Sequence, residues 1–137
     1  MRFTKQFINS LSYKIVGCAI EVHKQLGPGL LESVYETCLM EELISQGLKV
    51  ERQIPVPIIY KGKDLGTNLV LDLVVNDLVV VELKAVEVMI PVFKAQLLSY
   101  LKLTGKPKGL LINFHCENIK DHLVPLVTDV FAKLPQS

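Results

Sequence analysis

The first third of the chain repeats its apolar side chains at helical spacing. Between residues 12 and 26 the repeat falls three or four positions apart, as on one face of an amphipathic helix; its members are Ile15, Val16, Ala19, Ile20, Val22 and Leu26. Gly27 then supplies a helix stop. Beyond the corner Gly27-Pro28-Gly29, a second amphipathic segment runs from residue 30 to about residue 46. The pattern therefore predicts two helices joined as a hairpin.

The middle of the chain changes to strand-like patterns. Three consecutive segments are rich in β-branched and other apolar residues and are bounded by turn formers; they are residues 49–60, 68–75 and 78–84. Pro55 and Pro57 interrupt the first segment, which favours an edge strand because proline cannot donate a ladder hydrogen bond. Asn76 and Asp77 favour a turn between the other two. We therefore expect three strands connected as hairpins.

The last third returns to a helix and then a strand. Residues 91–104 begin with proline and end before glycine, which are typical helix limits, and residues 109–114 read as a buried strand. Residues 115–137 are ambiguous, since Pro125 argues against an uninterrupted helix. The predicted order is α-α-β-β-β-α-β. It indicates an α/β fold with a mixed sheet of about four strands flanked by helices, the last strand entering by a helical crossover.

Composition limits the class of protein. With 137 residues the chain fits one domain, residues 1–137, and its longest apolar runs are too short to span a bilayer. The first ten residues lack the pattern of a signal peptide, so we expect a soluble cytoplasmic protein. The three cysteines lie far apart among apolar residues and are expected to pack in the core. A net charge of +1 offers no general case for nucleic-acid binding, which would need a local patch.

Charged residues interrupt the apolar strands in an unusual way. In the stretch VVVELKA, residues 79–85, Glu82 and Lys84 share one strand face. Asp72 lies within the apolar run LVLDLVV, and Glu32 lies in the first turn of the second helix. Burying isolated charges is costly, so these residues either reach the surface or serve chemistry.

Two interpretations of these charges stay open. Glu32 can simply favour the positive end of the helix dipole, and Asp72 can form a structural ion pair with Lys84. Alternatively, the carboxylates are the oxygen ligands that Mg²⁺ prefers. In that case the ammonium of Lys84 is suited to orient a water molecule and to offset charge on a phosphoryl oxygen.

The metal interpretation makes a demand on strand register. A two-residue turn at Asn76-Asp77 would place Asp72 opposite Val81 and leave Asp72 and Glu82 on different faces. A three-residue connection or a single bulge instead pairs Asp72 with Glu82. We therefore expect an odd offset in this hairpin if the carboxylates act together.

Further polar residues lie at helical spacing from the candidate site. Gln96 and Tyr100 are four positions apart and share one side of their helix; they either face the charged end of the sheet or are exposed to solvent. Tyr35 follows Glu32 by three positions, so its ring packs on the first helix or its phenol holds the Glu32 carboxylate. His23 is expected to bond to the backbone or to a neighbouring glutamate rather than to act as a base.

The segment Gly29–Tyr35 matches a G-x-x-E-x-x-Y signature. Together with QLLSYLKLTG and GLLINF, it makes the chain resemble the GxxExxY proteins over nearly its whole length. That family looks like a minimal member of the PD-(D/E)XK nuclease superfamily. The resemblance implies a restriction-endonuclease-like core and hydrolysis of phosphodiester bonds. A catalytically inactive binding or regulatory module is the rival interpretation.

The resemblance also implies roles for individual residues. Binding of Mg²⁺ or Mn²⁺ falls to Glu32, Asp72, Glu82 and Leu83. Catalysis falls to the same three acids together with Lys84, which assists the attacking water. Substrate-binding or supporting roles fall to Tyr35, Gln96 and Tyr100, the last two at the spacing of the Q-x-x-x-Y motif of RecB-like exonucleases. The implied partner is nucleic acid, DNA before RNA, without a membrane, and a second copy or another protein is expected to help so small a domain grip a polymer.

Overall fold

Two long helices open the structure, a computed structural model that describes residues 3–137, with the backbone only at residue 67. Helix α1 (Lys5–Leu26) begins after Thr4, whose hydroxyl accepts a hydrogen bond from the amide of Phe7 at 3.0 Å. This N-cap and the buried side chains of Ile8 and Leu11 extend the helix beyond its predicted start at residue 12. Helix α2 follows the Gly-Pro-Gly corner and spans Glu32–Ser45.

The sheet has five strands in the order β1-β2-β3-β4-β5. Their bounds are β1 Val50–Tyr60, β2 Lys63–Val75, β3 Val79–Lys84, β4 Lys108–Asn113 and β5 Leu123–Val127. Neighbouring strands are antiparallel except β3 and β4, which are parallel. Helix α3 (Pro91–Thr104) makes the crossover between that parallel pair. The predicted order of elements and the mixed α/β fold are confirmed.

The strand number is one higher than the four expected, because the ambiguous tail contributes β5. Its Pro125 lies on a strand that pairs only with β4, an edge position where the missing N–H can face away from the ladder. A 3-10 turn (Ile119–His122) precedes β5, and a short helix α4 (Asp129–Ala132) follows it.

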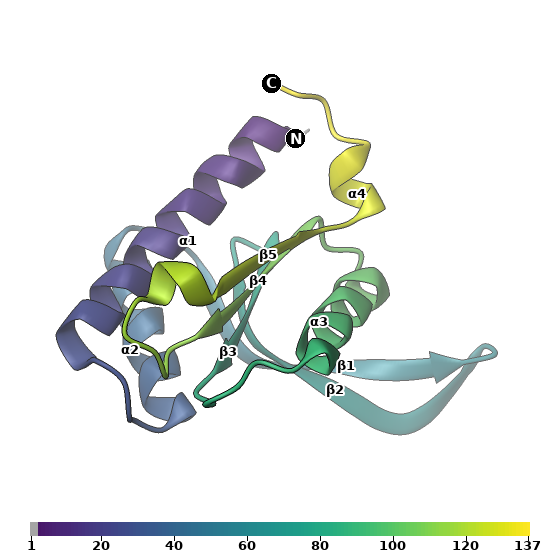
Figure 1. Cartoon of the computed structure of the whole chain (residues 1–137). Coiled ribbons are helices and arrows are strands. Elements are labelled where there is room, and N and C mark those ends of the chain that lie inside the picture. The colour runs from purple at the N-terminus through teal and green to yellow at the C-terminus, as the bar shows by residue number, and fades with distance from the viewer. Residues whose placement is uncertain (1–2) are drawn as a thin grey trace.

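Helices cover both faces of the sheet (Figure 1). Side chains of α1 and α2 pack with Leu73, Val81 and Leu83 in one cluster of buried residues, and α3 packs with Val80 and Leu111 in another. Strand β3 is buried on both faces, which explains its nearly continuous apolar sequence. Its two charged residues, Glu82 and Lys84, therefore lie on a strand that helices cover on both faces.

A long hairpin projects from the body of the molecule (Figure 1). Strand β2 pairs with β3 through Leu73, Val74 and Val75, and beyond Leu73 it continues with β1 alone to the turn at residues 61–62. We call residues 54–71 of this hairpin the arm. Strand β1 lies at the edge of the sheet, as its two prolines predicted.

Within residues 3–137, no helix is both long enough and apolar enough to cross a membrane.

Candidate active site

The register of the β2–β3 hairpin brings the two central acids together. Val75 pairs with Val79, so three residues form the connection, and Asn76 and Asp77 adopt positive φ angles of 51° and 58°. Continuing this register beyond the pair Leu73–Val81 places Asp72 opposite Glu82. The odd offset expected from the sequence is thus present, and both acids share the strand face of Lys84.

The carboxylates of Asp72 and Glu82 replace main-chain ladder bonds where they meet. The amide of Asp72 donates to Oε1 of Glu82 at 3.1 Å, and the amide of Leu83 donates to Oδ2 of Asp72 at 2.9 Å. Glu82 is buried, with 7% of its surface exposed, and Asp72 is half-buried. Each hydrogen bond uses one oxygen of its carboxylate, which leaves the other oxygen available as a ligand.

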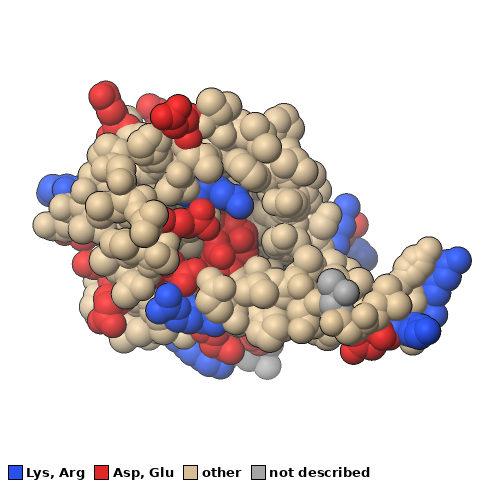
Figure 2. Space-filling view, turned by 90° about the horizontal axis from the view of Figure 1, so that it is seen from below, with Lys and Arg blue, Asp and Glu red and all other residues tan. Residues whose placement is uncertain are grey.

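Burial and the charge of Asp72 raise the proton affinity of two neighbouring glutamates. Burial and then the nearby charge of Asp72 raise the pKa of Glu82 to about 8, against smaller opposing effects of the hydrogen bond from the Asp72 amide and of the charge of Lys84. Partial burial of its carboxyl group, followed by the charge of Asp72, also raises the pKa of Glu32, with Glu36 adding to the effect. Figure 2 shows Asp and Glu side chains gathered in a hollow with Lys and Arg side chains beside them. A proton or a cation would relieve this repulsion.

The ammonium of Lys84 is held by an aromatic ring. Its Nζ lies 4.4 Å from the ring centre of Phe93, at the start of α3. A small cavity of about 30 Å³ adjoins this contact, and its walls include Glu82, Lys84, Gln96 and Tyr100. Burial and then the charge of Glu82 raise the pKa of the Tyr100 phenol. Helix α3 therefore brings Gln96 and Tyr100 to the charged end of the sheet.

Tyr35 does not hold the Glu32 carboxylate, so that interpretation is wrong. The hydroxyl of this fully buried residue donates to the carbonyl of Gly27 at 2.6 Å and accepts from the amide of Leu30 at 3.2 Å. Its ring stacks on Phe114, with centroids 4.7 Å apart, rather than on α1 alone. Tyr35 thereby fixes the corner before α2, and so it sets where Glu32 begins that helix.

Other residues near the site carry no clear sequence signal. Glu36 is buried and binds Arg52 and Gln53 of β1. Asn113, at the end of β4, is buried, and its side chain hydrogen bonds to the amide and the carbonyl of Val86. The periodic pattern treats Glu36 as a polar helix residue, because its partners are distant along the chain. Asn113 fixes the segment that leaves β3 directly after Lys84.

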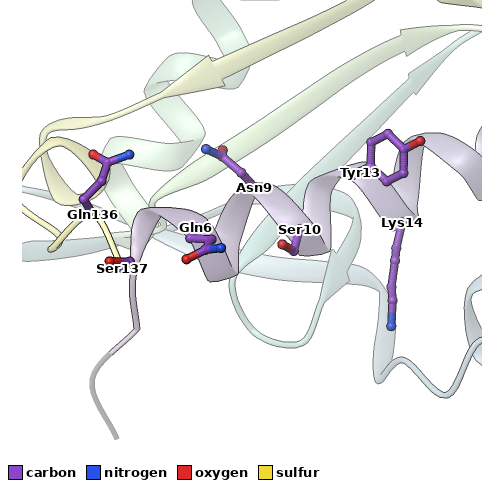
Figure 3. A pocket seen from close by; sticks show the side chains of 7 residues that line it. All are labelled: Gln6, Asn9, Ser10, Tyr13, Lys14, Gln136 and Ser137. Carbon is purple, nitrogen blue, oxygen red and sulfur yellow. The ribbon is translucent and has the colours of Figure 1, made fainter.

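The histidine of α1, His23, binds the backbone as expected. The Nε2 atom of His23 lies 2.7 Å from the carbonyl oxygen of Cys116, which confirms a bond to the backbone. A larger hollow lies elsewhere, along α1 and the C-terminal residues (Figure 3). It measures about 630 Å³, and its lining residues are Gln6, Asn9, Ser10, Tyr13, Lys14, Gln136 and Ser137, so no Asp, Glu, His or Cys side chain of residues 3–137 lies there.

The donor set of the site suits a hard divalent cation in part. Asp72 and Glu82 present two facing carboxylates with an unmet demand for positive charge, which is the chemistry of such a site. Glu32 is close enough to respond to Asp72. Within residues 3–137, however, no three His, Cys, Asp or Glu side chains are arranged to hold one ion together. The pair fits a metal, and Glu32 would join it only after moving closer.

Comparison with known families agrees with this geometry. A family model described as the PD-(D/E)XK nuclease superfamily matches residues 9–124. Searches among curated proteins and among solved structures found no match. The matched residues include Asp72, Glu82, Lys84 and the whole of α3. They make up most of the sequence, and the chain belongs to the PD-(D/E)XK nuclease superfamily.

Proposed function

We propose that this protein is a metal-dependent nuclease that hydrolyses phosphodiester bonds of nucleic acid. The observation that carries the proposal is the pairing of Asp72 and Glu82 across the β2–β3 hairpin, with Lys84 on the same strand face. Superfamily membership makes phosphodiester hydrolysis the reaction to test first. Within the superfamily, the signature in Gly29–Tyr35 supports a place among the GxxExxY proteins.

Asp72 and Glu82 are the proposed ligands of Mg²⁺ or Mn²⁺, with Glu32 as a third carboxylate. When bound, such a cation lowers the pKa of water and polarises a phosphoryl oxygen. The side chain of Leu83 is fully buried and apolar, so its proposed contribution is through the main chain. Its amide already holds Oδ2 of Asp72, which orients that carboxylate.

The remaining roles follow from where the chain places its polar groups. The Lys84 ammonium lies over the ring of Phe93, a position from which it can orient the attacking water and offset charge on the phosphate. Gln96 and Tyr100 line the same small cavity. We assign them to hydrogen bonding with the substrate or with the Lys84 ammonium.

The arm supplies a contact surface for a nucleic-acid backbone. It leaves the body beside Asp72 and carries Lys61 and Lys63 at its tip, where Figure 2 shows exposed basic side chains. The nine residue steps of β2 from Lys63 to Asp72 span about 30 Å at the usual strand rise. A polymer seated at the acids and lying along the arm would therefore meet these lysines roughly nine nucleotides away.

A second candidate function is a catalytically inactive binding or regulatory module. The observation that favours it is that Asp72 and Glu82 already serve the architecture, since each accepts a main-chain hydrogen bond that the ladder would otherwise make. In such a module the pair would close the end of the sheet and would need no metal.

Hydrolysis of labelled single- and double-stranded DNA and RNA, with Mg²⁺ or Mn²⁺, separates the two candidates. The nuclease predicts cleavage that chelation abolishes and that both Asp72→Asn and Lys84→Ala remove. Lys94→Ala, an exposed lysine on α3, is the matched control and should retain activity. Absence of cleavage of all four substrates by the folded wild-type protein would favour the inactive module.

A further inference from the structure

A buried carboxylate of α2 is bound to the hairpin next to the candidate active site. Glu36 is 5% exposed. Its Oε2 accepts a hydrogen bond from Nη2 of Arg52 at 2.8 Å, and its Oε1 accepts one from Nε2 of Gln53 at 2.7 Å. Both oxygens of one helix residue thus bind consecutive residues of β1. We call these three residues the brace.

The backbone at Gln53 is unusual for its residue type. Its φ angle is +49°, in the left-handed region that glycine tolerates and that other side chains disfavour. A side chain that adopts this conformation needs compensating interactions. The charge-assisted bond to Glu36 is such an interaction, so the brace holds a strained backbone in place.

This strained residue lies opposite Asp72. The β1–β2 register pairs Arg52 with Leu73 and Ile54 with Leu71, so Gln53 and Asp72 are the residues between. Leu73 packs in the cluster of α1 and α2, whereas Leu71, two positions away, packs in the cluster of α3. Regular alternation would keep both on one face. The hairpin therefore turns over at Gln53 and Asp72, where the arm begins.

We infer that Glu36 is a positioning residue for Asp72: through Gln53 it maintains the turned-over backbone that aims the Asp72 carboxylate at Glu82 and Leu83. This inference rests on the proposed function for its catalytic meaning. Its structural content stands alone, because the orientation of Asp72 can be measured without metal, substrate or turnover. A residue that only stabilises the fold would leave that orientation intact in the folded protein.

The amide of Leu83 reports the orientation, since it donates to Oδ2 of Asp72. We propose to measure its hydrogen exchange by NMR in the metal-free protein, with the amide of Ile112 on β4 as an internal reference. Glu36→Ala should speed exchange at Leu83 by about tenfold or more relative to Ile112, the effect of losing a hydrogen bond to a charged group. Glu36→Gln, which keeps an acceptor for Gln53, should have a smaller effect.

Two further variants make the test specific. Glu51→Gln removes an exposed carboxylate of β1 that pairs at 3.8 Å with Lys49, just before the strand, and it should leave exchange at Leu83 unchanged. Gln53→Gly removes the need for the brace, because glycine adopts the positive φ without strain. Gln53→Gly alone should preserve slow exchange at Leu83, and it should largely restore slow exchange to Glu36→Ala.

The outcomes separate the inference from the proposed function. If Glu36→Ala lowers global stability but exchange at Leu83 and Ile112 changes equally, Glu36 is only structural and the inference is overturned. Failure of Gln53→Gly to restore Leu83 also overturns it, because the effect would not pass through Gln53. Should Glu36→Ala not fold, Glu36→Gln and Gln53→Gly decide by the same comparison. A wild type without nuclease activity would leave these measurements valid and refute only the proposed function.

Discussion

Replacing Glu82 with glutamine should change how stability depends on pH. Burial and Asp72 raise the pKa of Glu82 from 4.5 to about 8, so between these values the folded protein binds a proton that the unfolded chain releases. The free energy of unfolding therefore falls as pH rises through this range and levels off above about pH 8. The interval between the two pKa values corresponds to at most about 5 kcal/mol.

Glutamine keeps the shape and the acceptor oxygen of protonated glutamic acid but cannot ionise. We expect Glu82→Gln to match the wild type near pH 4, below the unfolded pKa, and to become progressively more stable than it toward pH 8.5. The measurement is urea unfolding at several pH values in the presence of EDTA. Far-UV circular dichroism is the probe, because the chain has no tryptophan. The pH dependence of the wild type is subtracted from that of Glu82→Gln, which removes contributions that both proteins share, including those of the histidines.

The control replaces Glu87, an exposed carboxylate just after β3, with glutamine. Its curve should run parallel to that of the wild type. Parallel curves for Glu82→Gln and wild type would show that Glu82 ionises normally and would refute the reasoning about burial and repulsion. A loss of stability in Glu82→Gln at every pH, as removing one member of a structural ion pair produces, would do the same.

Further outcomes follow from the site, the arm and the corner before α2. Millimolar Mg²⁺ or Mn²⁺ should raise the melting temperature of the wild type by mass action on the folded state, and Asp72→Asn should remove that shift. Lys84→Ala should destabilise the metal-free protein by removing the cation beside the acids, and added metal should restore much of the loss; calorimetry with and without EDTA measures both. Combined replacement of Lys61 and Lys63 by serine should make the slope of log affinity against log salt for a 20-base-pair duplex less negative by about 2, and an unchanged slope would exclude the arm as a phosphate contact. Tyr35→Phe should cost about 1–3 kcal/mol in urea unfolding, because it leaves two backbone groups of the corner without their partner.

Local patterns predicted most of the elements and the central pair of acids. Amphipathic spacing, proline and glycine positions and apolar runs act over a few residues, so they are readable in order along the chain. The alternation of side chains between the two faces of a strand is equally local. It required an odd offset if Asp72 and Glu82 were to share a face, and the three-residue connection provides it. The tail around Pro125 stayed ambiguous because a five-residue edge strand depends on the partner strand more than on its own sequence.

Only the tertiary structure decided the contacts between segments that no local pattern links. The phenol of Tyr35 binds the corner rather than Glu32. The ring of Tyr35 stacks on Phe114, and in that position its hydroxyl donates to the carbonyl of Gly27. The positive φ of Gln53 and its bond to Glu36 join positions 17 residues apart. The sequence by itself determined which side chains could form a site, since it fixes the type of each residue and which residues of a strand share a face. Packing decided their orientation and raised the pKa of Glu32 and Glu82, because burial and the distance between two carboxylates exist only once α2, β2 and β3 are assembled.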